Sequence, residues 1–125
     1  MTVMVVDDEA DVRILFEQRF RREVRDGRIT FCFALSGEEA LELLERHPES
    51  VTLILSDINM PGMNGLDLLK VVKAKHRRLK VFMITAYGDE EYHRRAYEYG
   101  CDDYFTKPID FGVLKERLLV RSPEE

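Results

Sequence analysis

Short apolar segments rich in β-branched residues alternate along this chain with segments of helical periodicity. Strands are predicted over 3–6, 29–34, 51–56, 80–84 and 103–106. Helices are predicted over 11–24, 36–47, 66–75, 89–100 and 110–120. Strands and helices that alternate with short connections favour parallel strand pairing through right-handed crossovers. The sequence therefore predicts an α/β fold in which helices cover both faces of a five-stranded parallel sheet.

The apolar character of the strands indicates their order in the sheet. The first, third and fourth are apolar throughout, as expected of strands covered on both faces. The common doubly wound arrangement has the strand order 2-1-3-4-5, with a ligand crevice at the switch between strands 1 and 3. A chain of 125 residues has room for one domain. That domain is expected over 1–121, with a polar tail or linker stub over 122–125.

Local signals mark several of the predicted helices. Ser36 and Glu39 form the pattern of a capping box, in which the two residues satisfy free backbone N–H groups reciprocally. Asp89 is expected to cap the helix that ends at Gly100. One continuous helix is expected over 11–24, because its apolar residues recur at helical spacing. These residues are Val12, Leu15, Phe16, Phe20 and Val24.

Composition disfavours several classes of protein. No apolar run approaches the roughly 20 residues of a membrane span, and the N-terminus lacks a signal-peptide pattern, so we expect a cytoplasmic location and no membrane partner. Cys32 and Cys101 lack metal-ligand spacing and are expected to be small core residues. The net charge of −5 disfavours direct binding to nucleic acid. The basic stretches 18–28 and 73–80 are more typical of solvated helix faces, with a nucleic-acid surface as the second alternative.

Polar residues stand at the ends of four of the predicted strands. They are Asp7 and Asp8 after the first strand, Asp57 after the third, Thr85 after the fourth and Lys107 after the fifth. Side chains at these ends are expected to converge on one crevice. Two carboxylates about 4 Å apart repel by about 4 kcal/mol at an effective dielectric of about 20, so three of them require protonation or a cation. Mg²⁺ fits, because it takes oxygen ligands from carboxylates, waters and phosphate.

Each of these residues has an ordinary alternative when it is taken alone. Asp7 and Asp8 would serve as helix caps, and Asp57 would start a turn. Lys107 would be a surface lysine, and Thr85 a common residue at a strand end. Together they favour a site in which the Asp57 carboxylate attacks phosphorus and forms an acyl phosphate. There the Lys107 ammonium and the Thr85 hydroxyl would contact phosphoryl oxygens.

The chain resembles the receiver domains of two-component response regulators over essentially its whole length. The motifs that carry the resemblance are VDDE at 6–9, DINMPGMNG at 57–65, TA at 85–86 and DYFTKP at 103–108. The resemblance is specific, because ordered blocks at separate strand ends must all agree with one spacing. It implies the flavodoxin-like, doubly wound version of the fold predicted above.

The resemblance also implies a role for each site residue. Asp57 resembles the phosphoacceptor and Lys107 the lysine that holds a phosphoryl oxygen. Asp8 resembles the direct Mg²⁺ ligand, with Asp7 acting through water and the backbone carbonyl of Asn59 completing the protein ligands. Mn²⁺ is the alternative ion. The peptide bond between Lys107 and Pro108 is expected to be cis.

A conformational switch is implied by the same family. Phosphorylation adds about −1.5 to −2 charges, and Thr85 would move toward the new group while Tyr104 rotates into the space it leaves. This would change the face made by 89–100, 103–106 and 110–120. Tyr104 has a plain alternative as a packed aromatic at an edge strand. Tyr87 is expected to lie at the mouth of the crevice and to shield the acyl phosphate from water.

The implied partners follow from the resemblance. A histidine kinase or histidine phosphotransfer protein would supply the phosphoryl group, and a downstream protein or fused output domain would read it. A phosphorylation-dependent homodimer, with Asp103 paired to Arg117 across it, is a further expectation. The tyrosines and basic residues within 92–99 would suit a partner surface.

Three other functions compete with this interpretation. A phosphatase of the haloacid dehalogenase type also uses an aspartate nucleophile and Mg²⁺, but it needs a general acid where this chain has Asn59. Turnover of external substrates is therefore not expected, and the chain would catalyse only its own phosphorylation and dephosphorylation. A flavodoxin-like cofactor binder is disfavoured because the acidic run 7–9 would repel a phosphate. A receiver fold that binds partners independently of phosphate is the remaining alternative.

Overall fold

A five-stranded parallel sheet forms the centre of the computed structural model, which describes residues 1–86 and 90–120. Its strands are β1 (Thr2–Val6), β2 (Thr30–Ala34), β3 (Leu53–Asp57), β4 (Lys80–Thr85) and β5 (Asp103–Thr106). They pair in the order β2-β1-β3-β4-β5, and every pair is parallel. The predicted fold class and strand order are confirmed. The expected boundary at residue 121 and the tail 122–125 fall outside the described residues, so both stay predictions.

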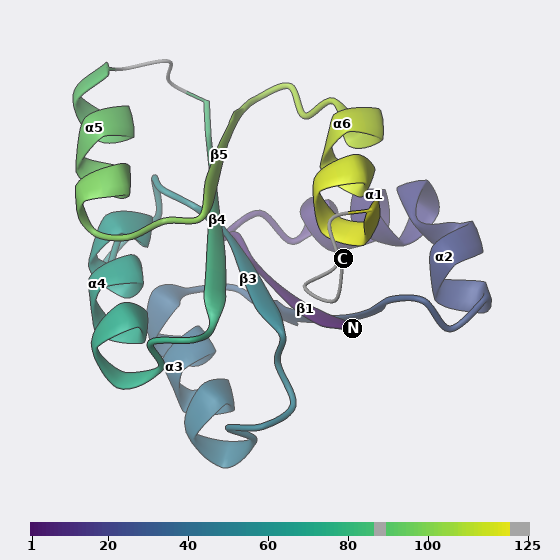
Figure 1. Cartoon of the computed structure of the whole chain (residues 1–125), viewed down its shortest axis with the longest axis horizontal. Coiled ribbons are helices and arrows are strands. Elements are labelled where there is room, and N and C mark those ends of the chain that lie inside the picture. The colour runs from purple at the N-terminus through teal and green to yellow at the C-terminus, as the bar shows by residue number, and fades with distance from the viewer. Residues whose placement is uncertain (87–89, 121–125) are drawn as a thin grey trace.

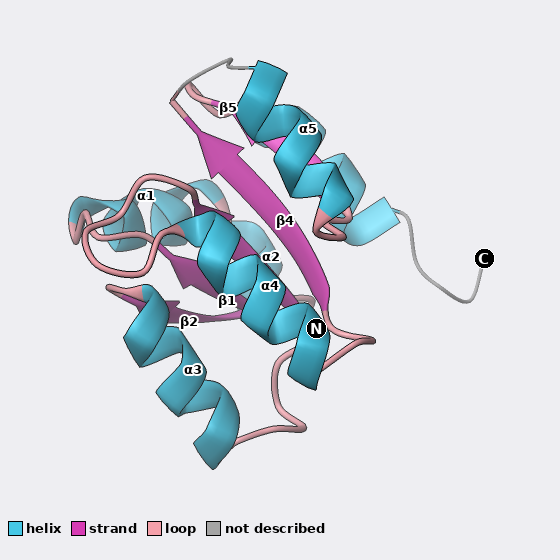
Figure 2. Ribbon diagram, turned by 90° about the vertical axis from the view of Figure 1, so that its left-hand side faces the viewer, coloured by secondary structure: helices cyan, strands magenta, loops and turns pink. Residues whose placement is uncertain are grey.

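Helices cover both faces of this sheet (Figure 1). They are α1 (Asp11–Arg19), α2 (Arg21–Arg25), α3 (Gly37–Arg46), α4 (Gly65–Lys75), α5 (Glu90–Glu98) and α6 (Phe111–Lys115), which continues as the π-helical segment η1 (Glu116–Val120). Figure 2 shows α3, α4 and α5 on one face of the sheet, and Figure 1 shows α1 and α6 on the other. Because all the strands are parallel, the connections at their carboxyl ends gather at one edge of the sheet.

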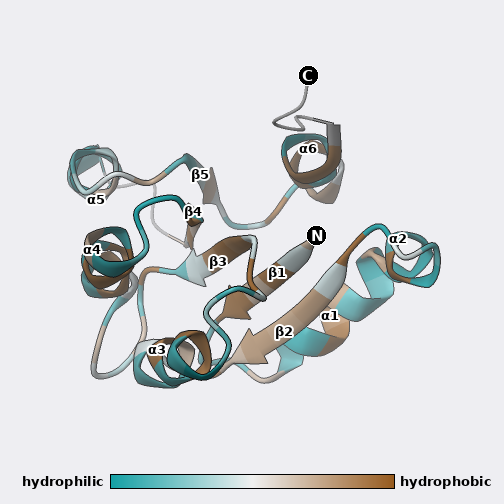
Figure 3. Cartoon of the chain, turned by 60° about the horizontal axis from the view of Figure 1, so that its bottom comes forward, coloured by the Kyte–Doolittle hydropathy of each residue, from teal (hydrophilic) through white to brown (hydrophobic). Residues whose placement is uncertain are grey.

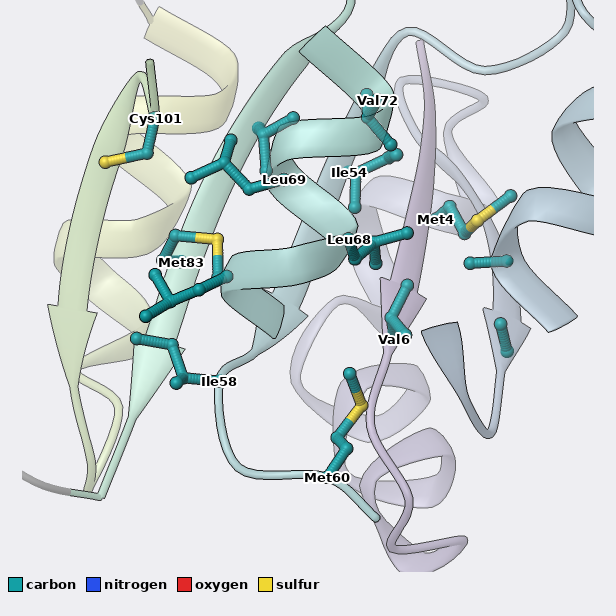
Figure 4. Close-up of a cluster of buried hydrophobic side chains, with 14 of the residues drawn as sticks. Met4, Val6, Ile54, Ile58, Met60, Leu68, Leu69, Val72, Met83 and Cys101 are labelled. Atoms are coloured by element: carbon teal, nitrogen blue, oxygen red, sulfur yellow. The ribbon is translucent and has the colours of Figure 1, made fainter. Parts of the chain in front are cut away.

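Two apolar cores follow from the alternation of side chains along the strands. Met4 and Val6 of β1 point into the core beneath α3, α4 and α5, where Figure 4 shows them near Ile54 and Leu68. Val3 and Val5 of the same strand point into the core beneath α1 and α6. Figure 3 shows the strands as hydrophobic and the outer sides of the helices as largely hydrophilic. The apolar sequence of β1 is thus explained by burial on both faces.

The continuous helix predicted over 11–24 was wrong in one respect. The helix ends at Arg19, and Phe20 has φ −109° and ψ 19° before α2 begins at Arg21. Phe20 is fully buried, with its ring centroid 5.9 Å from that of Phe16 and 5.1 Å from that of Phe31. The backbone turns where this ring enters the core, and Val24 beyond the turn is 43% exposed instead of packed.

The helix caps agree with the sequence patterns, with one difference in detail. The Ser36 hydroxyl accepts a hydrogen bond from the Glu39 N–H group at 3.0 Å. The Glu39 carboxylate accepts one from the Leu35 N–H group at 2.7 Å, so the second half of the capping box reaches one residue further back than expected. Asn64 caps α4 through the Asp67 N–H group at 2.9 Å. The expected cap at Asp89 lies outside the described residues.

Both cysteines are free thiols, and Cys101 is a core residue as predicted, whereas Cys32 is only half-buried. Cys101 is buried, and burial, with a smaller contribution from Asp102 and Asp103, raises the pKa of its thiol to about 12. The thiolate, which is the reactive form, is therefore scarce at neutral pH. Within residues 1–86 and 90–120, no helix combines the length and the apolar character that a membrane span requires.

An ion-paired network ties the amino ends of β4 and β5 to α4, and it allows a stability test. The Asp102 carboxylate accepts hydrogen bonds from the Val81 N–H group and the Lys73 ammonium, both at 2.8 Å. Asp102→Ala leaves both donors without that acceptor, so we expect it to lower the free energy of unfolding by about 1–3 kcal/mol. Urea unfolding measures this loss. Glu17→Ala, which breaks the exposed pair with Arg13, is the control and should cost no more than about 0.5 kcal/mol. Equal losses would contradict the role assigned to the network.

Candidate functional site

The carboxyl ends of four neighbouring strands place the polar residues named above beside one another. Asp57 and Thr85 are the last residues of β3 and β4. Asp7 follows β1 directly, and its N–H group donates to the Ala34 carbonyl at 3.1 Å, so that it continues the ladder between β1 and β2. Lys107 follows β5, and its N–H group donates to the Thr85 carbonyl at 2.8 Å. Backbone pairing thus sets the spacing of the site.

Three carboxylates converge at this edge of the sheet. Asp7, Asp8 and Asp57 each offer an oxygen, and these oxygens all lie within 4.8 Å of one another. Asp7 and Asp57 are each 7% exposed, whereas Asp8 is exposed. Burial raises the pKa of Asp7 and repulsion from Asp57 adds to the rise, against the opposing effects of the Glu9 N–H group and of Lys107. Such a cluster favours a cation, and its all-oxygen donor set suits a hard divalent ion.

The Lys107 ammonium group faces the two buried carboxylates. Its Nζ atom lies 3.2 Å from Asp57 Oδ2 and 3.5 Å from Asp7 Oδ2. Burial acts to lower the pKa of Lys107, but the attraction of Asp7 and Asp57 outweighs it, and the pKa is raised. Lys107 is therefore charged at neutral pH. The peptide bond that joins it to Pro108 is cis, as the resemblance implied.

The loop after β3 is held against the site by backbone hydrogen bonds. The Ile58 N–H group donates to the Ile84 carbonyl at 3.1 Å, and the Gly65 N–H group donates to the Ile58 carbonyl at 2.8 Å. Between these anchors, the backbone N–H group of Asn59 donates to Asp57 Oδ1 at 3.4 Å. The side-chain amide of Asn59 donates to Thr85 Oγ1 at 3.5 Å. The amide contact with buried Thr85 was not predicted, because it depends on side-chain rotamers.

A cavity of about 360 Å³ opens beside this site between α1 and the start of α6. Asp57 and Lys107 contribute polar groups to its lining, and apolar side chains that include Leu15 and Phe111 contribute the rest of its walls together with further charged residues. Helical periodicity assigned Leu15 to the core, yet it is 37% exposed in the structure. Sequence reasoning missed this cavity, because periodicity does not distinguish a core position from the wall of a groove.

The remaining predicted residues lie away from the acidic cluster. Tyr104 is half-buried and packs against α5, where its ring centroid is 4.7 Å from that of His93. Asp103 and Arg117, expected to pair across a dimer, form an ion pair with each other within the chain. The homodimer, which a single chain does not test, stays a prediction. Tyr87 lies outside the described residues.

Comparison with known proteins identifies relatives of the whole chain. Residues 3–119 match the family described as "Response regulator receiver domain". The response regulator protein PilR of Pseudomonas aeruginosa is 39% identical over 125 residues, which are 97% of this chain and 27% of PilR. Sporulation initiation phosphotransferase F of Bacillus subtilis is 32% identical over 116 residues, which are 93% of this chain and 89% of that protein. The chain thus spans about a quarter of PilR and most of the second relative.

A solved structure supports the same relationship. The CheX–CheY–BeF₃–Mg²⁺ complex from Borrelia burgdorferi contains a chain that aligns with a TM-score of 0.85 at 26% sequence identity. The alignment covers 96% of this chain and 87% of that one.

Proposed function

The chain belongs to the response regulator receiver domain family, and we propose that its Asp57 accepts a phosphoryl group from a phosphohistidine on a partner protein. A carboxylate oxygen of Asp57 forms a bond to phosphorus, the bond from phosphorus to the histidine nitrogen breaks, and that nitrogen keeps the electron pair. The product is an acyl phosphate. The observation that carries the proposal is the convergence of Asp57 with two further carboxylates and the Lys107 ammonium at one edge of the sheet.

Lys107 has two roles in this proposal. Before transfer, its ammonium group compensates the buried carboxylates of Asp57 and Asp7, which it contacts at 3.2 and 3.5 Å. During transfer it stabilises the negative charge on the phosphoryl oxygens, as a preorganised donor does at a site of developing charge. Because the pKa of Lys107 is raised, the ammonium form is present at neutral pH.

We assign a Mg²⁺ ion to the acidic cluster, with Mn²⁺ as the alternative. Asp8 and Asp57 would hold it directly with the Asn59 backbone carbonyl, and Asp7 would hold it through water. The donor set fits, since one lysine does not compensate three carboxylates whose oxygens lie within 4.8 Å of one another. The bound ion would supply charge neutralisation for the phosphoryl group. The presence of Mg²⁺ together with BeF₃ in the CheX–CheY complex is in keeping with this assignment.

The signal would leave the site through Thr85 and Tyr104. Thr85 is buried at the end of β4, and its hydroxyl would follow the added phosphoryl oxygens. Tyr104 would rotate into the space that Thr85 leaves. Because Tyr104 packs on His93 of α5, this rotation would alter the surface of α5, β5 and α6. A downstream protein or an output domain fused to the receiver would read that surface. PilR and sporulation initiation phosphotransferase F fit these two alternatives, since the chain spans 27% of the first and 89% of the second.

The proposal predicts a single phosphoryl adduct on intact mass spectrometry after incubation with acetyl phosphate and Mg²⁺. The adduct should require both Mg²⁺ and Asp57, so EDTA and Asp57→Asn should each abolish it. Asp67→Asn changes an aspartate in the first turn of α4 by the same substitution and serves as the control. An adduct that persists in Asp57→Asn would place the acceptor elsewhere. Failure to form one at any Mg²⁺ concentration would favour a receiver fold that binds partners independently of phosphate.

A further inference from the structure

A basic groove is lined by residues from the end of α1, from α2 and from α6. These three helices lie on the same side of the sheet (Figure 1). The volume of the groove is about 410 Å³. The residues that line it are Gln18, Arg19, Arg21, Arg22, Glu23, Arg25 and Lys115. The break at Phe20 contributes to this arrangement, because it separates α1 from α2 just where the arginines are concentrated. The basic stretch 18–28 is thus gathered into a concave surface in the folded chain.

Most of the positive charge in this groove is not compensated within the chain. Among residues 1–86 and 90–120, Arg21 and Arg22 form no ion pair, and the Arg19 guanidinium lies over the Phe111 ring at 5.3 Å. The ion-pair partner of Arg25 among the described residues is the exposed carboxylate of Asp26, at 3.6 Å. In the second basic stretch, Lys73 lies 2.8 Å from Asp102 and Lys75 lies 3.9 Å from Glu45, while Arg77 and Arg78 form no ion pair among the described residues. The four arginines of the first stretch are the ones that line this groove together.

The floor of the groove is a partly satisfied carboxylate. Glu23 is only 8% exposed, and its Oε2 atom lies 3.2 Å from Lys115 Nζ. Lys115 is fixed in turn over the Phe20 ring, with its Nζ atom 5.2 Å from the ring centroid. The other oxygen of Glu23, Oε1, is buried and accepts no hydrogen bond from the described residues. A buried acceptor without a donor is costly, so a turn of the Glu23 side chain toward a ligand that brings a donor is favoured.

We propose that this groove binds a soluble phosphorylated compound that also carries a hydrogen-bond donor, such as a nucleotide. Arginine guanidinium groups bind phosphate oxygens in bidentate geometry, which suits Arg21 and Arg22. An N–H or O–H group of the same compound would donate to Glu23 Oε1 once that side chain has turned toward the groove. Because Lys115 already neutralises Glu23, the four arginines of the groove are left to balance a phosphate. The volume falls within the range of about 300–1,000 Å³ that is usual for small-molecule sites.

Isothermal titration calorimetry of the wild-type chain with AMP and with inorganic phosphate tests the proposal. The double variant Arg21→Ala/Arg22→Ala should lower the affinity for AMP by roughly tenfold or more. Arg77→Ala/Arg78→Ala removes the same number of charges from the other basic stretch and should leave the affinity within about twofold. Equal losses in the two double variants would show diffuse electrostatic attraction and overturn the proposal. So would AMP binding that survives Arg21→Ala/Arg22→Ala unchanged, because it would place the phosphate outside this groove.

Glu23→Gln tests the floor of the groove separately from its walls. The substitution removes a negative charge, so inorganic phosphate should bind at least as tightly as it does to the wild type. AMP should lose affinity relative to inorganic phosphate, because an ionised acceptor is replaced by a weaker neutral one. An unchanged ratio of the two affinities would contradict the role of Oε1. Circular dichroism should show an intact fold in each variant.

Sedimentation with phosphatidylglycerol vesicles distinguishes a soluble ligand from a lipid headgroup, which shares the phosphate chemistry. We expect no more sedimentation of the wild-type chain than of Arg21→Ala/Arg22→Ala. If vesicles sediment the wild type alone and AMP does not bind, the groove recognises a membrane surface and the proposal of a soluble ligand is wrong. None of these measurements depends on phosphorylation of Asp57, so their failure is distinct from failure of the proposed function.

Discussion

Gly65→Ala is expected to lower the free energy of unfolding by about 3 kcal/mol and to slow phosphorylation of Asp57, because α4 begins in direct contact with the end of β3. A Cβ atom at position 65 would lie 2.1 Å from the Asp57 carbonyl oxygen and 2.8 Å from the Ile58 Cα atom. Both are backbone atoms, so the contact is relieved only if β3 or the start of α4 moves. Movement of β3 displaces the nucleophile, and movement of α4 displaces the loop that carries Asn59.

Gly27→Ala is the matched control for this substitution. Gly27 has φ +76°, but no atom lies within 4 Å of a Cβ atom built there, so its cost is confined to backbone strain of about 1–2 kcal/mol. Urea unfolding and the initial rate of adduct formation with acetyl phosphate and Mg²⁺ measure both variants. Only Gly65→Ala should affect the rate. If the two variants lose equal stability and phosphorylate equally fast, the close approach of α4 to Asp57 is not a constraint on the site.

The strand order could be predicted from the sequence because strands buried on both faces have a recognisable apolar pattern. Strands covered on both faces, such as β1 and β3, must be apolar at consecutive positions, and few other arrangements place such strands between helices. Once the order is known, the residues at the carboxyl ends of β1, β3 and β5 must meet at one edge. The proximity of Asp7, Asp57 and Lys107 was therefore predictable from topology without any side-chain detail.

The break at Phe20 could not be predicted in the same way. Helical periodicity is unchanged across 11–24, because one residue with altered dihedral angles barely shifts the apolar pattern. The cause of the break is tertiary: the Phe20 ring contacts Phe31 from β2, which is distant in the sequence. Propensity and spacing within one helix carry no information about such a contact. The basic groove that depends on this break was likewise invisible in the sequence.

Contacts that depend on the rotamers of long side chains form a third class. The sequence placed Asn59 and Thr85 at one edge of the sheet, but not the 3.5 Å contact between the Asn59 amide and the Thr85 hydroxyl. Asp103 and Arg117 were expected to pair between two chains, and the ion pair that they form within one chain was not predicted. In each case the backbone allows several partners, and packing around the side chain selects one.

Lys107→Met is expected to slow adduct formation with acetyl phosphate by about 10²-fold, because it removes the positive charge beside the nucleophile. Methionine has a similar length but no charge, so the packing around residue 107 is largely kept. Asp57 and Asp7 lose the ammonium group that lies 3.2 and 3.5 Å from their carboxylates, and only Mg²⁺ is left to offset the charge of the incoming group. The initial rate, measured by intact mass at saturating Mg²⁺, reports the loss.

Lys73→Met is the control that separates this effect from general damage to an ion pair. Lys73 is buried to a similar degree and lies 2.8 Å from Asp102, but at the opposite end of the strands. Its substitution should lower the free energy of unfolding by about 1–3 kcal/mol and leave the initial rate within about twofold. Lys107→Met should therefore slow adduct formation, whereas Lys73→Met should lower only the free energy of unfolding. Equal rates in the two variants would mean that Lys107 pairs with Asp57 for structural reasons and takes no part in phosphoryl transfer.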